Sequence, residues 1–346
     1  MQENKWEKEM PEIPDHVHNA VLCALDTLNT ENVKGDGGHM MKHKSVRRAG
    51  LVAVLAAAMV GTTAFAAELI WNNKTVEEFH NPPMELQQKT VDNGVAVLPN
   101  VSVTDSGVTV TAVQMLQDEN RVYIMLRVES EEAVIDGNSL FDRMELYDGE
   151  NHNIFNNIGA QFIDEEDGKL TNDGYYVIDA LKDSVTGWNG TTLEVALSGL
   201  SYYQYENGGA ASGGKKIEGN WKLELALTDA SALSKTVELG KDIHCGDVPV
   251  TVNYVKISPL SIVISYDAAD VEKIKVAEDD FIPELLSAKL LDKQGNELLK
   301  TGYGAMSSWN TEDGQYVVQM GLIGVVDMEQ ADQIELGGGT LTAKIQ

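Results

Sequence analysis

One long apolar run, AGLVAVLAAAMVGTTAFAA at Ala49–Ala67, carries no charged residue and follows a polar N-terminal segment. As a helix, its nineteen residues at about 1.5 Å each would extend about 28 Å, close to the ~30 Å hydrocarbon core of a bilayer. The run is preceded by four basic residues and followed by Glu68; the basic residues are Lys42, Lys44, Arg47 and Arg48. Because positive flanks stay in the cytoplasm, this pattern predicts a single-pass protein of the cell membrane, with residues 1–48 cytoplasmic and the C-terminal part extracellular.

The same run also fits a secretory signal peptide. Ala64-Phe65-Ala66 is an A-x-A sequence of the kind that precedes a cleavage site, here before Ala67. Translation starting at Met40 or Met41 would supply the short basic n-region of an ordinary signal peptide. The sequence therefore leaves two topologies, a retained anchor and a cleaved leader, of which the anchor is the leading interpretation.

Charge separates the two sides of this run. Residues 1–48 hold seven of the 26 Lys and Arg and eight of the 54 Asp and Glu, so the rest of the chain carries a net charge near −27. An acidic surface of this size repels nucleic acid, so we expect no nucleic-acid partner.

Cys23 and Cys245 lie on opposite sides of the run, so no disulfide is predicted in the anchored topology. No calcium-loop or zinc-ligand spacing is present, so we predict no metal and no cofactor.

Residues 1–39 contain one organised segment, a predicted amphipathic helix followed by a glycine-rich linker. Pro14 and Asp15 are typical of a helix start, and apolar residues then recur every three or four positions. They are Val17, Val21, Ala24, Leu25 and Leu28. So short a helix is marginal alone and favours folding against a partner. Binding to the inner membrane surface is the alternative, but its polar face lacks Lys and Arg.

The order of parts resembles a known family. PEIPDHVHNAVLCALDTL, a short linker, the basic KHKSVRR, an alanine-rich span ending in AFAAE and an acidic β-rich exterior together resemble single-span, anti-sigma-factor-like membrane proteins of Gram-positive bacteria, whose exported domain has no known function. The resemblance implies that the cytoplasmic helix binds a sigma factor. It assigns that contact to Pro14, Val17, Val21, Leu25 and Leu28. The chain lacks the His-x-x-x-Cys-x-x-Cys of zinc-type anti-sigma factors, so the short helix would have to make the contact alone.

After the apolar run, short segments alternate between apolar and polar residues. Trp71 is placed for the membrane interface, and Pro82 and Pro83 interrupt any helix, so residues 68–97 are predicted to form a juxtamembrane stalk. Period-two patterning then predicts antiparallel strands with one buried face. The clearest are Val108–Val113, Val122–Val128, Tyr175–Ile178, Leu193–Leu197 and Trp221–Leu227.

This pattern occurs twice. Residues 108–130, 142–155 and 172–181 are echoed in the same order by 250–268, 287–300 and 312–322, at offsets of 142, about 144 and 140. Three blocks at nearly constant offset indicate a duplicated unit. Asp148-Gly149 and Gln294-Gly295-Asn296 are predicted hairpin turns, and Asn207–Lys216 is a predicted long hairpin loop within the first copy.

The predicted fold is mainly β, with two tandem antiparallel β-sandwich (immunoglobulin-like) domains, one transmembrane helix and one short cytoplasmic amphipathic helix. The predicted boundaries are 1–39 for the cytoplasmic helix and linker, 40–67 for the basic flank and span, 68–97 for the stalk, 98–240 for the first β domain and 241–346 for the second.

No catalytic pattern survives inspection. There is no G-x-S-x-G, H-E-x-x-H or Walker loop, and His80, His152 and His244 are scattered. The acidic run Asp164–Asp167 is best explained as a solvated loop, and the aromatic group Tyr202, Tyr203 and Tyr205 as cross-strand packing or a sugar-stacking surface. We therefore expect no enzyme. The hypotheses are an anti-sigma-like membrane regulator whose exterior senses or docks an extracellular ligand or protein, and a secreted or tethered adhesive binding protein.

Overall fold

The computed structural model describes most of the chain beyond residue 70. The described ranges are 71–148, 155–163, 169–182, 192–203, 214–228, 231–275, 283–299, 306–311 and 313–345. All of them belong to one compact unit, Gly50–Gln346, and none to the other unit, Met1–Ala49. The predicted cytoplasmic helix and the predicted span at Ala49–Ala67 lie outside these ranges. Among the helices that are described, none is long and apolar enough to cross a membrane.

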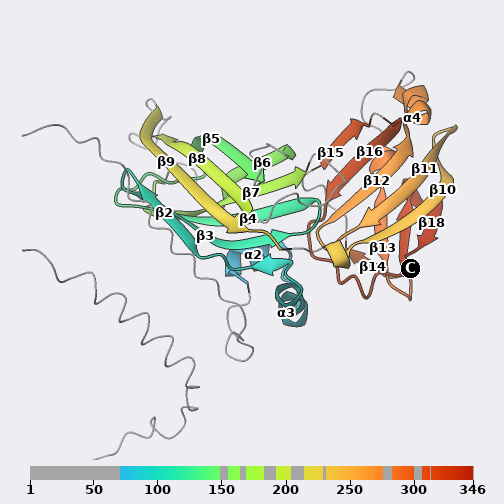
Figure 1. The fold of residues 1–346 in the computed structure, drawn as a ribbon, viewed down its shortest axis with the longest axis horizontal. Coiled ribbons are helices and arrows are strands. Elements are labelled where there is room, and N and C mark those ends of the chain that lie inside the picture. Colours follow the sequence, from blue (N-terminus) through green and yellow to red (C-terminus); the bar gives the residue numbers. More distant parts are fainter. Residues whose placement is uncertain are drawn as a thin grey trace, which may run out of the picture. The chain divides into compact units, whose positions relative to one another are not determined.

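The first half of this unit contains two antiparallel sheets (Figure 1). In sheet 1 the strand order is β1-β3-β4-β7-β6, and β2 pairs with β3 beside β1. Its strands are β1 (Ala96–Val97), β2 (Val101–Asp105), β3 (Val108–Gln117), β4 (Arg121–Ser130), β6 (Phe155–Ile163) and β7 (Asp173–Lys182). In sheet 2 the order is β5-β8-β9, with β5 (Leu140–Asp148), β8 (Thr192–Tyr203) and β9 (Gly214–Ala226). All the strands predicted above in this half are confirmed.

Alternation along these strands places one core between the two sheets. Val110 on β3 and Ile124 on β4 are fully buried and belong to the same hydrophobic cluster as Val195 on β8 and Trp221 on β9. Burial of apolar area at ~25 cal/mol per Å² makes this cluster the main stabilising element of the first half.

The second half contains two further sheets and its own core. Sheet 3 has the order β10-β11-β12-β16-β15, and sheet 4 the order β14-β13-β17-β18. Sheet 3 comprises β10 (Lys235–Cys245), β11 (Val248–Ile257), β12 (Ser261–Asp267), β15 (Met306–Asn310) and β16 (Gln315–Gly321). Sheet 4 comprises β13 (Ala288–Leu291), β14 (Glu297–Leu299), β17 (Gln333–Leu336) and β18 (Leu341–Lys344). Helix α4 (Ala268–Lys275) and the short 3₁₀ turn η4 (Pro283–Leu286) lie between β12 and β13. The 3₁₀ turn η3 (Ser231–Leu233) precedes β10, and η5 (Gly337–Gly339) joins β17 to β18. Side chains of both sheets again share one cluster, which includes Ile264 and Ile334.

The echoed sequence blocks fall on corresponding strands of the two halves. β3, β4 and β7 follow one another in sheet 1 as β11, β12 and β16 do in sheet 3, and β5 in sheet 2 takes the place of β13 in sheet 4. Even an irregularity is repeated: the register of β3 against β4 shifts between Ala112 and Gln114, and that of β11 against β12 between Val252 and Tyr254. This shift corrects the offset of the first block from 142 to 140 residues, so Val108 corresponds to Val248.

The predicted boundary between residues 240 and 241 is wrong, because it cuts through β10. Residues Lys235–Cys245 form one strand that pairs with β11, so the second half begins at Lys235. The Gly-Lys pair at the predicted boundary lies at a β-bulge: the register shifts between Glu238 and Lys241, and Gly240 has a φ of +55°. Glycine adopts that conformation without steric cost, which is why it occurs at such a bulge.

The hairpin-turn predictions can be checked where the chain is described. Asp292 accepts hydrogen bonds from the backbone N–H groups of Gln294 and Asn296, at 2.8 Å each, and Gly295 has a φ of +81°. This turn joins β13 to β14, as predicted. Strand β9 pairs with β8 up to Tyr203 and Gly214, so the last three residues of the predicted loop at Asn207–Lys216 belong to β9. Gly149 lies outside the described residues.

Candidate functional site

The predicted stalk is wrong for residues 71–97, which are folded onto sheet 1. The N-cap of helix α2 (Asn73–Glu78) is Asn72, whose side chain accepts a hydrogen bond from the backbone N–H of Lys74 at 2.9 Å. The N-cap of helix α3 (Met84–Asp92) is Pro83, where proline is tolerated because the start of a helix leaves its N–H groups unpaired. The two prolines therefore separate two helices and do not prevent helix formation.

The connection between these helices is a tight turn in an uncommon conformation. His80 and Asn81 are consecutive non-glycine residues with positive φ, at 57° and 54°. The turn is held by the backbone N–H of Asn81, which donates to the carbonyl of Val76 at 2.7 Å. Such left-handed residues cost energy and persist only where surrounding packing fixes them.

That packing is an aromatic cluster on the outer face of sheet 1. Trp71 is 2% exposed and not at a lipid interface, so its predicted interfacial position is wrong. Its ring meets Phe79 edge-to-face at 5.8 Å, and Phe79 meets Tyr123 of β4 in the same way at 4.8 Å. The indole N–H of Trp71 donates to Thr90 of α3 at 3.1 Å. The cluster also includes Leu260 and Val325, so α2 and α3 contact both halves.

A groove of about 700 Å³ lies where these helices meet the second half. One wall is the α2–α3 turn with α3, and the other is formed by β14 and the segment before β17. Its apolar lining residues are Phe79, Pro82, Pro83, Leu86, Leu298, Leu299, Val325 and Val326, and its polar ones are His80, Asn81, Glu85, Lys89, Asp327, Glu329 and Gln330. A volume of this size falls in the range of ordinary ligand pockets.

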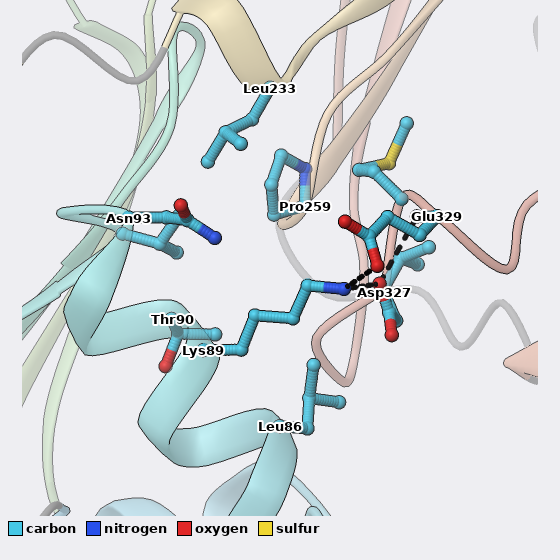
Figure 2. A pocket seen from close by; sticks show the side chains of 11 residues that line it. Leu86, Lys89, Thr90, Asn93, Leu233, Pro259, Asp327 and Glu329 are labelled. Atoms are coloured by element: carbon cyan, nitrogen blue, oxygen red, sulfur yellow. Dashed lines mark hydrogen bonds and ion pairs between the residues drawn. The ribbon is translucent and has the colours of Figure 1, made fainter.

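Lys89 bridges the two walls. Its ammonium donates to Asp327 Oδ1 and to Glu329 Oε2, at 2.6 Å each (Figure 2). On the side of α3 shown in Figure 2, the same lysine borders a smaller cavity of about 130 Å³, lined also by Thr90, Leu233 and Pro259. Burial would lower the pKa of Lys89, but the two carboxylates outweigh it and raise that pKa above its ordinary value. Burial would likewise raise the pKa of Asp327, but the bond from Lys89 and further donors lower it overall.

We expect Lys89→Met to lower the free energy of unfolding by about 0.5–1 kcal/mol near neutral pH, as for partly exposed ion pairs. The lowered pKa of Asp327 contributes stability above its unfolded pKa, which is lost as pH falls below about 4. The raised pKa of Lys89 contributes stability below its unfolded pKa, which is lost as pH rises above about 10. Urea unfolding of the wild type and of Lys89→Met at a series of pH values measures the difference in unfolding free energy.

Lys222→Met is the matched control for this experiment, because Lys222 makes a more exposed ion pair with Glu194 at 2.6 Å, remote from the groove. We expect Lys222→Met to lower the free energy of unfolding by less than Lys89→Met does at every pH. If the difference in unfolding free energy between wild type and Lys89→Met stayed constant from about pH 3 to about pH 11, the ion pairs of Lys89 with Asp327 and Glu329 would contribute no electrostatic stability.

The groove offers apolar contacts, backbone turns and a net acidic rim, which suits binding. Glu85, Asp327 and Glu329 outnumber Lys89 among its charged lining residues. In the part of the chain that the structure describes, no group of three or more His, Cys, Asp and Glu side chains is arranged to hold a metal ion. The chemistry available at the groove is recognition by shape, hydrogen bonds and charge.

None of the predicted sigma-binding residues falls within the described ranges. Pro14, Val17, Val21, Leu25 and Leu28 lie outside the described residues, as do Tyr205 and the acidic run Asp164–Asp167. Of the two described members of the aromatic group, Tyr202 is buried, at 7% exposure, and Tyr203 is exposed, at 39%. A shared sugar-stacking surface of Tyr202 and Tyr203 is therefore wrong, because Tyr202 belongs to the core of the first half.

Sequence reasoning missed the groove for two reasons. The helix signals at Asn72, Pro83 and Glu85 were present but were outweighed by the proline pair. The contact of Lys89 with Asp327 joins residues 238 positions apart, and no local pattern signals it.

Comparison with known proteins adds little. No family model matches the chain, and no curated protein matches it. Among solved structures, "The crystal structure of the conserved domain protein from Bacillus anthracis" is similar, with 14% sequence identity and a TM-score of 0.39, and the match covers 69% of this chain and 75% of that one. A likeness at this level gives no information on function.

Proposed function

We propose that this chain is a membrane-anchored regulator resembling an anti-sigma factor, whose cytoplasmic helix binds a sigma factor and whose acidic β-rich region docks an extracellular partner. The groove is the observation that carries the docking role. It is built on α2 and α3, the first described elements after the predicted span, with Trp71 only four residues beyond Ala67. An occupant of the groove would therefore contact the segment nearest the membrane.

Within this proposal each half is a β-sandwich of the immunoglobulin-like kind. Support comes from the pairing of sheet 1 with sheet 2, and of sheet 3 with sheet 4, around one hydrophobic cluster each. The role of these sandwiches is recognition without catalysis.

Topology is the first test. Cys245 is 6% exposed and will not report its compartment in the folded protein, so an exposed cysteine is needed. Full-length Lys293→Cys/Cys245→Ser, with Cys23 retained, is treated with a membrane-impermeant maleimide on whole cells and then after lysis. We expect position 293, in the exposed β13–β14 turn, to react on whole cells and Cys23 only after lysis. A shortened product that starts at Ala67 and accumulates in the medium would overturn the regulator and favour a secreted binding protein, consistent with the A-x-A sequence at Ala64–Ala66.

Sigma-factor binding is the second test. Membranes containing the tagged full-length chain are solubilised, and sigma subunits of RNA polymerase that co-purify are identified by mass spectrometry. Leu25→Glu places a charge on the apolar stripe and is expected to abolish recovery, because the stripe is the predicted contact. Asn19→Glu, on the polar face of the same helix, is the matched control and is expected to retain recovery. Equal recovery with both variants would exclude this helix as the sigma-binding element.

A further inference from the structure

Two hairpin turns occupy the same position in the two halves. Gln117 of β3 pairs with Val122 of β4, and Ile257 of β11, 140 residues later, pairs with Ile262 of β12. Each turn is closed by the same bond, from the backbone N–H of Asp118 to the carbonyl of Arg121 at 3.0 Å and from that of Ser258 to Ser261 at 2.9 Å. Residues 118–121 and 258–261 are therefore equivalent, one for one.

The neighbouring strand ends are equivalent too. The backbone N–H of Lys182, at the end of β7, donates to Asn120, and that of Leu322, just after β16, donates to Leu260, at 2.8 Å in both cases. Arg121 lies opposite Leu181 in sheet 1, as Ser261 lies opposite Gly321 in sheet 3. The offset of 140 residues thus holds across this whole end of each sheet.

The two equivalent turns contact each other. Asp118 Oδ2 accepts hydrogen bonds from the backbone N–H of Leu260 at 2.9 Å and from the hydroxyl of Ser261 at 2.8 Å. The side-chain amide of Asn120 donates to Ser258 at 3.4 Å and to Ser261 at 3.2 Å. The side chains of Asp118, Asn120, Ser258 and Ser261 are all fully buried, so the contact is sealed from water.

These contacts are reciprocal. Asp118 is hydrogen-bonded to Leu260, and its equivalent Ser258 is hydrogen-bonded to Asn120, the equivalent of Leu260. Position 121 meets 260 through the Arg121 guanidinium, which donates to the carbonyl of Leu260 at 3.1 Å, and the counterpart 261 meets 120. Strand β7 also contacts its own equivalent β16, and β6 contacts its equivalent β15. A contact in which i meets j and j meets i is the mark of a two-fold, isologous interface.

We infer that the two halves are docked as an internal two-fold pair, through a self-complementary surface at the β4–β7 end whose partner is the copy of that surface in the second half. The chain is in this sense a homodimer fused into one polypeptide. This inference concerns the joint between the halves and is independent of the proposed regulatory function.

One departure from symmetry lies close to the pseudo-axis. Arg121 is 3% exposed, pairs with Asp179 at 2.8 and 2.7 Å, and reaches across to the carbonyl of Leu322 at 2.5 Å. The equivalents of Arg121, Asp179 and Leu181 are Ser261, Gln319 and Gly321. Gly321 leaves the room that the guanidinium occupies, since a Cβ there would lie 2.9 Å from Arg121 Cζ. Gln319 in turn donates to the carbonyl of Asn120 at 2.9 Å, which is the carbonyl equivalent to that of Leu260.

This asymmetry gives a decisive experiment, because a true two-fold joint must tolerate exchange of the three side chains between halves. The first variant, Arg121→Ser/Asp179→Gln/Leu181→Gly, removes the ion pair. The second adds Ser261→Arg/Gln319→Asp/Gly321→Leu and rebuilds it from the other side, facing the carbonyls of Asn120 and Lys182. Spin labels at Thr104→Cys on β2 and Lys293→Cys report the distance between halves by pulsed electron resonance, in a full-length chain with Cys23→Ser and Cys245→Ser.

We expect one narrow distance in the parent and a second, longer distance in more than about half of the three-residue variant molecules, because the bonds from Arg121 to the carbonyls of Leu260 and Leu322 in the other half are lost. We expect recovery of the single distance in the exchanged variant. Arg127→Ser/Asp173→Gln is the matched control: it removes an ion pair between the same two strands that is exposed, and is expected to leave the distance unchanged. An exchanged variant as disordered as the three-residue one would overturn the two-fold joint.

A single substitution tests the same inference if the exchanged variant fails to fold, as judged by loss of its β-sheet circular dichroism. Gln319→Ala removes the second half's own donor to Asn120. A two-fold joint predicts a second, longer distance here as well, because the equivalent carbonyls of Asn120 and Leu260 each accept a bond from the other half. A distance unchanged from the parent would mean that the joint depends on Arg121 alone, and would overturn the proposal.

Discussion

Asp118→Ala is expected to lower the free energy of unfolding by about 3–5 kcal/mol. The carboxylate is fully buried, and both of its oxygens accept hydrogen bonds. One oxygen accepts from the backbone N–H groups of Asn120 at 2.8 Å and Arg121 at 2.9 Å, and the other from Leu260 and Ser261. Burial raises the pKa of Asp118, while these four donors each act to lower it. Removing the carboxylate leaves three buried backbone N–H groups without this acceptor and out of reach of water, which is the costly case for a buried polar group.

Urea unfolding followed by circular dichroism measures this loss. Asp118→Asn is expected to fall between wild type and alanine, because its amide oxygen still accepts but its NH₂ group faces donors. Asp105→Ala is the matched control, since Asp105 also accepts a backbone N–H, from Asn220 at 2.8 Å, but in an exposed setting. We expect less than about 1 kcal/mol there. If Asp118→Ala cost no more than Asp105→Ala, the buried network would not be a stabilising element.

Trp221→Ala is expected to cost about 3–5 kcal/mol, the range for removing a buried aromatic side chain. Trp221 is fully buried in the core of the first half and meets Phe141 edge-to-face at 5.4 Å. Its indole N–H donates to the carbonyl of Val108 at 2.9 Å, which joins β9 of sheet 2 to β3 of sheet 1. The variant therefore leaves a large cavity between the two sheets and removes the hydrogen bond that joins them.

Thermal and urea unfolding of Trp221→Ala and Trp221→Phe separate these two effects. Phenylalanine keeps most of the ring but not the donor, so we expect it to lose about 1–2 kcal/mol from the hydrogen bond and reduced packing. Trp309→Ala, on the edge strand β15 where the side chain is only half-buried, is the comparison and is expected to cost clearly less. Equal losses at positions 221 and 309 would contradict the assignment of Trp221 to the centre of the core.

The strands of this protein are readable from its sequence because half-buried sheets impose an alternation that few other structures produce. VTVTAV at the start of β3 and WKLELA at the end of β9 show that pattern, and each became a strand. The duplication was readable for the same reason, although its offset was two residues off in the first block, where Val and Thr repeat and permit a slip by one full alternation.

The parts that the sequence left open depend on contacts between distant residues. Pro82-Pro83 marks a break between helices, but whether those helices pack depends on Trp71 and Phe79 finding Tyr123. The bulge at Gly240 and a domain linker have the same local composition, and only pairing with β11 distinguishes them. The polar residues of Asp118–Arg121 are typical of a solvated turn, and their burial arises only because the equivalent turn of the second half lies against them.

The bridge from Lys89 to Asp327 sets an order of events during synthesis. A chain made from its N-terminus folds units as they become available, so the first half can pack before the second exists. Lys89, however, can form its ion pair only after Asp327, 238 residues later in the chain, has been synthesised. The groove therefore cannot form before most of the second half has been made, and a nascent or C-terminally shortened chain that ends before Val325 lacks part of one wall even when its first half is folded. Completion of the groove thus marks a chain whose second half has been made and has folded.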